Sequence, residues 1–130
     1  MGILGGNMGY RSEVCIVMKK NVVDDMLVYM SEVDSETREQ MQEILNDLPD
    51  QHIVKNDAEL YYWDWIKWYP EFKGVDAIQK LLENSNKEDY LFLRLGEDVA
   101  DTESSGDYWE NPFNAHTERY IAFEDFEEEH

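Results

Sequence analysis

The chain has 130 residues, and 30 Asp and Glu against 11 Lys and Arg give it a formal net charge of −19 at pH 7. Hydrophobic residues make up 42% of the chain and aromatic residues 13%, which excludes a disordered acidic chain and indicates one folded domain with an acidic surface. The charge argues against direct binding to nucleic acid or to an anionic membrane. No apolar stretch is long enough to span a bilayer, so we expect a soluble, intracellular protein.

The first half of the chain predicts a strand followed by helices. Residues 1–9 are rich in glycine and carry no pattern, which predicts a flexible lead-in. The continuous apolar run over residues 14–18 is typical of an interior strand. Apolar residues at helical spacing over 22–33 predict a helix, with Asn21 as its N-cap. A second start signal, Asp-Ser, opens another helical pattern over residues 34–48.

The second half predicts strands and one more helix. The aromatic-rich residues 60–69 predict a strand, and the apolar spacing over 75–82 predicts a short helix. Residues 90–95 predict a further strand. The polar residues 97–117 predict a loop or an irregular hairpin, and the alternation over 118–126 predicts a last strand.

These elements predict a single α+β domain over residues 10–126, followed by an acidic tail at 127–130. We expect two layers, with a mixed or antiparallel sheet of about four strands and two to three helices packed on one face. A split βαβ arrangement of the ferredoxin-like type is the nearest named alternative.

Three segments resemble a group of small phage and prophage proteins: Met8-Gly-Tyr-Arg-Ser-Glu-Val14, Trp65-Ile-Lys-Trp-Tyr-Pro70 and Leu93-Arg-Leu-Gly-Glu-Asp98. The likeness covers most of the patterned chain. It brings no known activity, so it assigns no functional residue, and it implies a phage context and the cytoplasm of a host cell. Small acidic phage proteins often antagonise host defence, as DNA mimics and anti-CRISPR proteins do, and the resemblance implies that role by analogy of class.

The acidic region after Leu95 is the first candidate site. Most of the excess negative charge falls there, and Arg119 is the only basic residue in it. A rigid array of carboxylates can occupy a cationic groove that otherwise holds nucleic acid, whereas a solvated loop and tail would need no partner. The carboxylates predicted to bind a partner are Glu97, Asp98, Asp101, Glu103, Asp107 and Glu110.

The aromatic strand is the second candidate site. Strict alternation predicts that Tyr61, Trp63, Trp65 and Tyr69 share one face with Lys67, and that Tyr62, Ile66 and Trp68 share the other with Asp64. One face must belong to the core, and the other is either covered by a helix or exposed as a binding patch. Trp63 and Trp65 are therefore included among the predicted partner-binding residues.

Catalytic and metal chemistry have weak support in the sequence. Residues 101–107 resemble the first half of a calcium loop, but Pro112 stands at the twelfth position, where the loop requires a glutamate. The lone Cys15 lies in an apolar run and is expected to be a core residue. His52, His116 and His130 belong to no catalytic motif. We expect no catalytic residue, no metal and no cofactor.

The sequence therefore predicts an acidic inhibitor that blocks a basic, nucleic-acid-binding surface of a host defence protein, with imitation of DNA as one route. We expect its partner to be a basic host protein, and we expect it to bind neither nucleic acid nor a membrane directly. The sequence is also compatible with association of the chain into a homo-oligomer. Two alternatives compete with this hypothesis. One is a small metal-dependent or hydrolytic enzyme, and the other is a structural or oligomeric protein whose charge only maintains solubility.

Overall fold

The computed structural model of the protein describes residues 9–118 and 120–124. Its sheet holds five strands, all antiparallel, in the order β2-β3-β1-β4-β5, and a separate two-stranded sheet pairs β6 with β7. This is the expected α+β fold, with one strand more in the main sheet than predicted.

In chain order the elements are β1 (Ser12–Lys19), α2 (Lys20–Glu32), α3 (Ser35–Gln42), the π-helical turn η1 (Glu43–Asp47), β2 (Gln51–Lys55), β3 (Ala58–Ile66), α4 (Lys73–Glu83), the 3-10 turn η2 (Lys87–Asp89), β4 (Tyr90–Gly96), β5 (Thr102–Gly106), β6 (His116–Thr117) and β7 (Ile121–Ala122).

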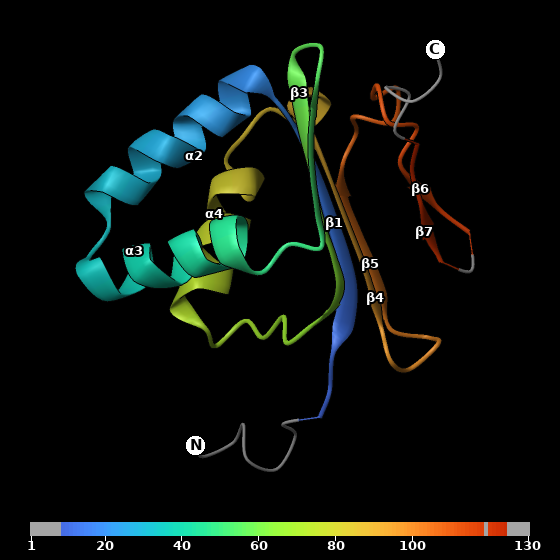
Figure 1. Ribbon diagram of the computed structural model, residues 1–130, viewed down its shortest axis with the longest axis horizontal. Helices are drawn as coiled ribbons and strands as arrows, with labels where there is room; N and C mark the ends of the chain where they lie inside the picture. The colour runs from blue at the N-terminus through green and yellow to red at the C-terminus, as the bar shows by residue number, and fades with distance from the viewer. Residues whose placement is uncertain (1–8, 119, 125–130) are drawn as a thin grey trace.

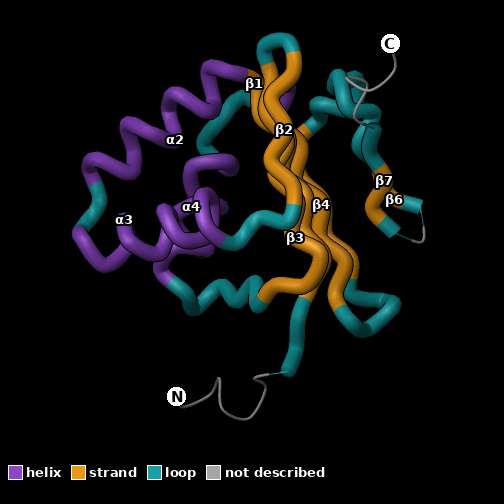
Figure 2. The backbone as a smooth tube through the Cα atoms, in the orientation of Figure 1, coloured by secondary structure: helices purple, strands orange, loops and turns teal. Residues whose placement is uncertain are grey.

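The main sheet is covered on both faces (Figure 1). The three α-helices pack on one face and form the helical layer. The chain after β5, called the C-terminal layer and comprising residues 107–118 and 120–124, crosses the other face, as the tube in Figure 2 makes clear. The predicted acidic tail and all but Gly9 of the predicted lead-in lie outside the described residues.

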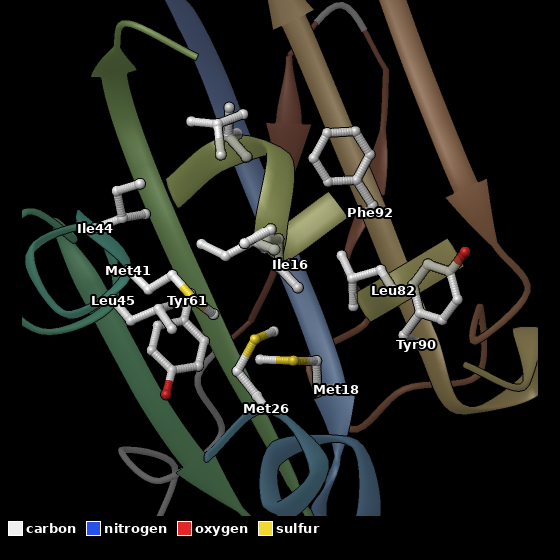
Figure 3. Close-up of a cluster of buried hydrophobic side chains, with 14 of the residues drawn as sticks. Ile16, Met18, Met26, Met41, Ile44, Leu45, Tyr61, Leu82, Tyr90 and Phe92 are labelled. Atoms are coloured by element: carbon white, nitrogen blue, oxygen red, sulfur yellow. The ribbon is translucent and has the colours of Figure 1, made fainter. Parts of the chain in front are cut away.

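Strand β1 is the central strand of the sheet, which explains its continuous apolar run. Ile16 and Met18 point into the core beneath the helices, shown in Figure 3. Cys15 and Val17 point into a second cluster beneath the C-terminal layer. A strand that is buried on both faces has no polar face to present, so the predicted interior strand is confirmed.

The helix boundaries follow the sequence signals in one case and depart from them in another. Asp34 caps α3 as predicted, because its carboxylate accepts the backbone N–H of Thr37 at 3.2 Å. The prediction of Asn21 as the cap of α2 is wrong, since the helix begins at Lys20 and Lys19 occupies the cap position without a side-chain hydrogen bond. Arg38 of α3 donates to the carbonyl oxygens of Met30 and Val33 at the end of α2, so a side chain of α3 satisfies the C-terminus of α2.

A bulge in β3 overturns the predicted alternation of the aromatic strand. Val14 lies opposite Trp63 and Ser12 lies opposite Ile66, so three steps along β3 match two steps along β1. The extra residue shifts the pleat, and Ile66 and Trp68 join Trp63 in the helical-side core instead of pointing to the opposite face.

The C-terminal region also differs from its prediction. Residues predicted as a loop or an irregular hairpin include a regular edge strand, β5, which pairs with β4. Of the last strand predicted over 118–126, only the two residues of β7 form a strand in the described part of the chain, and β7 pairs with β6 instead of joining the main sheet. This segment is held by fully buried Phe113 and by Asn111, whose side-chain oxygen accepts the backbone N–H groups of Phe113 at 3.1 Å and Ala115 at 2.9 Å.

Candidate functional site

One end of the main sheet brings together three segments that are far apart in the chain. Ser12 of β1 lies opposite both Ile66 of β3 and Gly96 of β4. Ile66 and Gly96 are therefore two strand spacings apart, or about 10 Å. Predicted site residues from the aromatic strand and from the acidic region thus lie near each other. We call this the open end of the sheet and define it by residues 10–11, 64–69 and 97–103.

Arg94 organises the acidic residues of the open end. Its guanidinium donates to Asp101 at 2.7 Å, to Glu103 at 2.8 Å and to the hydroxyl of Ser12 at 2.9 Å, and its side chain is only 15% exposed. The hydroxyl of Tyr10 donates to the same Asp101 carboxylate. Hydrogen bonds from Arg94 and then from Tyr10 lower the pKa of Asp101, so this carboxylate is committed to a structural ion pair.

Glu97 and Asp98 occupy the exposed part of the same turn and are held by backbone groups. The Glu97 carboxylate accepts the backbone N–H of Arg11 at 2.8 Å. The Asp98 carboxylate accepts the backbone N–H of Ala100 at 3.0 Å. Both side chains stay accessible to solvent while their positions are fixed, which is the arrangement that an electrostatic contact with a partner requires.

The two predicted tryptophans have opposite environments. Trp63 is 1% exposed, and its indole N–H donates to the carbonyl oxygen of Ile44 at 3.0 Å. That carbonyl lacks a helical partner because the N–H of Leu48 bonds to Glu43 instead, and Pro49, the next residue, has no N–H. Trp63 is therefore a core residue, which corrects its prediction as a partner contact. Trp65 lies at the bulge and is 54% exposed.

The remaining predicted carboxylates lie elsewhere. Asp107 and Glu110 follow β5, whereas Glu97 and Asp98 precede it. The five residues of β5 separate these two pairs by roughly 17 Å. The acidic region predicted as one array is thus divided between the open end and the opposite end of β5.

Exposed carboxylates also cover both layers of the molecule. In the helical layer they include Asp24, Asp25, Glu36, Glu39 and Glu43, and in the C-terminal layer they include Glu110, Glu118 and Glu124. The carboxylates of α3 lie on its solvated face, as is usual for an amphipathic helix. A surface of this kind has no single acidic face of the sort that a contiguous copy of a phosphate backbone needs.

A cavity of about 420 Å³ opens beside Trp65, between the α3–η1 segment and the chain that leads from β3 into α4. Ile44, Leu48 and Phe72 contribute apolar wall, and the side chain of Gln40 accepts the N–H of Gly74 at 2.8 Å and so joins α3 to the first turn of α4. Arg11 and Lys67 supply positive charge to the same cavity.

Several residues of this site were missed from the sequence. Arg94 is the only charged residue in the apolar run of β4, and that isolation is the signal that could have identified it as a paired, structural cation. Tyr10 and Arg11 precede β1, so their place at one end of the sheet follows only from the strand pairing. Leu48 ends a helical stripe in the sequence, and its place in the cavity wall follows only from the packing of the helical layer.

Within residues 9–118 and 120–124, no group of three or more His, Cys, Asp or Glu side chains is arranged to hold a metal ion. In the same part of the chain, no helix combines the length and the apolar character needed to cross a membrane. No known protein family, curated protein or solved structure matches this chain.

Proposed function

We propose that this protein is a phage-type inhibitor that binds a basic, nucleic-acid-binding surface of a host defence protein in the host cytoplasm and blocks it. The observation that carries the proposal is the open end, where exposed Trp65 lies near Glu97 and Asp98, two carboxylates held by backbone hydrogen bonds. Tryptophan is a frequent anchor at protein interfaces, and fixed carboxylates fit a cationic surface. The phage context rests on the resemblance noted in the sequence.

The inhibition would be steric and electrostatic, with no bond made or broken. The net charge of −19 accelerates the encounter with a basic surface, and Trp65 then supplies apolar contact area that salt does not weaken. Exposed carboxylates lie on both layers and form no single acidic face. We therefore place the contact at the open end, where the exposed tryptophan and the fixed carboxylates lie near each other, and docking there suffices to exclude nucleic acid from the partner's surface. A continuous imitation of the DNA backbone is not required.

The test is displacement of fluorescent duplex DNA from purified nucleic-acid-binding defence proteins, a CRISPR effector and a restriction endonuclease among them. The isosteric double variant Glu97→Gln/Asp98→Asn removes two charges but keeps both hydrogen-bond acceptors. We expect it to inhibit about three- to tenfold less well than the wild type. The matched control Asp107→Asn/Glu110→Gln removes the same charge at the other end of β5 and should inhibit normally.

The contribution of the aromatic side chain is tested separately. Truncation by Trp65→Ala should weaken inhibition about thirtyfold, the loss expected for a tryptophan anchor. The control Trp109→Ala removes another exposed tryptophan, which lies in the C-terminal layer. If no defence protein releases DNA, or if the two charge variants and the two tryptophan variants behave alike, the proposed function is wrong.

A further inference from the structure

The cavity beside Trp65 has the properties of a small-molecule site. Its volume of about 420 Å³ lies within the range of roughly 300–1,000 Å³ that is usual for ligand pockets. The wall is mainly apolar, with aromatic rings from Trp65 and Phe72 and aliphatic side chains from Ile44 and Leu48. A few polar groups interrupt this wall, which is the composition that fixes a ligand's orientation.

The charges of the cavity are unusual for so acidic a protein. Most basic side chains elsewhere are engaged: Lys19, Lys20, Lys73, Lys80 and Arg94 form ion pairs, and Arg38 donates to carbonyl oxygens. Among the described residues, the side chains of Arg11 and Lys67 form no ion pair, and both line this cavity. Two cations that form no ion pair with the described residues and lie beside an apolar cavity are complementary to an anionic head group.

The lining also holds two carboxylates, which make it formally neutral beside the two cations. Asp50 is engaged, since its carboxylate accepts the backbone N–H of Asp64 at 2.7 Å. Glu43 is the other carboxylate in the lining, and it is exposed to solvent, where its charge is screened. The formally neutral lining is therefore far less repulsive to an anion than the net charge of the chain suggests, and its two cations are the groups that an anion can pair with.

We propose that this cavity binds a small amphiphilic carboxylate, with its apolar or aromatic body against Trp65 and Phe72 and its carboxylate at Arg11 and Lys67. The ligand is a small molecule and the attraction is to cations, so this goes beyond the proposed function, which relies on carboxylates of the open end. Both activities use Trp65 at the open end, but the proposed function relies on the carboxylates of Glu97 and Asp98, and the cavity relies on the cations of Arg11 and Lys67.

The experiment compares three phenylalkyl probes of similar length, the first two of them isosteric, by isothermal titration calorimetry at low salt: 4-phenylbutyrate, 4-phenylbutanamide and 4-phenylbutylamine. We expect the carboxylate to bind about tenfold or more tightly than the neutral amide, and the amine to bind no better than the amide. The indole N–H resonance of Trp65 should shift on titration, and that of Trp109 should not. Equal affinity for carboxylate and amide, tightest binding of the amine, or no binding of any probe overturns the proposal.

Variants locate the charge contribution. Arg11→Gln and Lys67→Gln should each weaken binding of 4-phenylbutyrate about three- to tenfold and leave binding of the amide unchanged. Lys87→Gln is the matched control, because it removes a cation that also forms no ion pair in the described chain but lies outside the cavity. Glu43→Gln should strengthen binding of the carboxylate. If Lys87→Gln weakens binding as much as the cavity variants do, the carboxylate is responding to overall charge and the site is wrong.

The outcome is separable from that of the proposed function. Glu97→Gln/Asp98→Asn should bind 4-phenylbutyrate at least as tightly as the wild type does, because those carboxylates lie outside the cavity lining and their loss removes negative charge beside Arg11. Arg11→Gln and Lys67→Gln each remove a positive charge from the open end, so they should inhibit DNA binding by a defence protein at least as well as the wild type does while they weaken binding of the carboxylate. Either proposal therefore fails without the other.

Discussion

Replacing Arg94 with methionine should reveal how much the open end depends on a single cation. Methionine keeps an apolar stem of similar length and removes the guanidinium, with its hydrogen bonds to Asp101, Glu103 and Ser12. The carboxylates then retain only the Tyr10 hydroxyl and water. Because the side chains of Asp101 and Glu103 are 34% and 45% exposed, solvent offsets part of the loss. We expect the free energy of unfolding to fall by about 1–3 kcal/mol at pH 7.

The pH dependence of this difference is the stricter measurement. Arg94 holds the pKa of Asp101 below its ordinary value, so the pair stabilises the fold above about pH 4 and that stability is lost as pH falls through the lowered pKa. Urea unfolding followed by tryptophan fluorescence should therefore show a full difference at pH 5–7 that shrinks below about pH 4. The control Lys80→Met breaks an exposed pair with Asp76 and should cost far less than Arg94→Met does. Equal costs for the two variants, or a difference that does not shrink in acid, refute the structural role.

Three further changes test the layers that position the site. Trp63→Phe leaves the buried carbonyl of Ile44 without a donor and should cost about 2–3 kcal/mol in urea unfolding. Gly106→Ala should cost about 2 kcal/mol or more in the same assay, because its φ is 84° and a Cβ would lie 2.2 Å from a backbone oxygen. Phe113→Ala removes the anchor of the C-terminal layer and should cost about 3–5 kcal/mol. It should also speed labelling of Cys15 by a thiol reagent, since burial raises the pKa of that thiol and the C-terminal layer covers it.

Each of these changes has a control in the same chain. Trp65→Phe alters an exposed indole and should cost under about 0.5 kcal/mol, so a similar cost at both tryptophans would contradict the role of the hydrogen bond. Gly9→Ala places its Cβ in open space and should be neutral. If Phe113→Ala destabilises the protein but leaves the labelling rate of Cys15 in native buffer unchanged, the C-terminal layer is not what protects the thiol.

The central part of the fold could be predicted because its signals are local. The run over residues 14–18 is apolar at every position, which only a strand buried on both faces requires, and Asp34 caps α3 through its own third neighbour. The bulge at Trp65 carries no such signal. In a single extended segment, side chains are expected to alternate strictly between the two faces of the sheet. The extra residue in β3 is recognised only when its residues are paired with those of β1.

The sequence predicted which residue types belong to the candidate site, but it did not predict which of those residues lie together in the fold. Carboxylates and tryptophans were found by composition, but composition does not distinguish Glu97, held at the open end, from Glu110, which lies beyond the far end of β5. The C-terminal layer was missed for a related reason. Its strands are two residues long, and its packing depends on Phe113 and on a turn built around Asn111, so no periodic pattern marks it.

The net charge of the chain and the charge that a ligand meets are therefore different quantities. At physiological ionic strength the screening length is about 8 Å, which is less than the roughly 17 Å along β5. A partner docked at the open end is attracted during its approach by the whole −19 charge, but after docking it interacts with the charges within a screening length. Added salt should thus slow association of a basic partner more than it speeds dissociation, because Trp65 contributes contact that salt does not screen. The same argument allows Arg11 and Lys67 to hold an anion in an acidic protein, since the cavity lining is formally neutral and the carboxylates more than a screening length away contribute little.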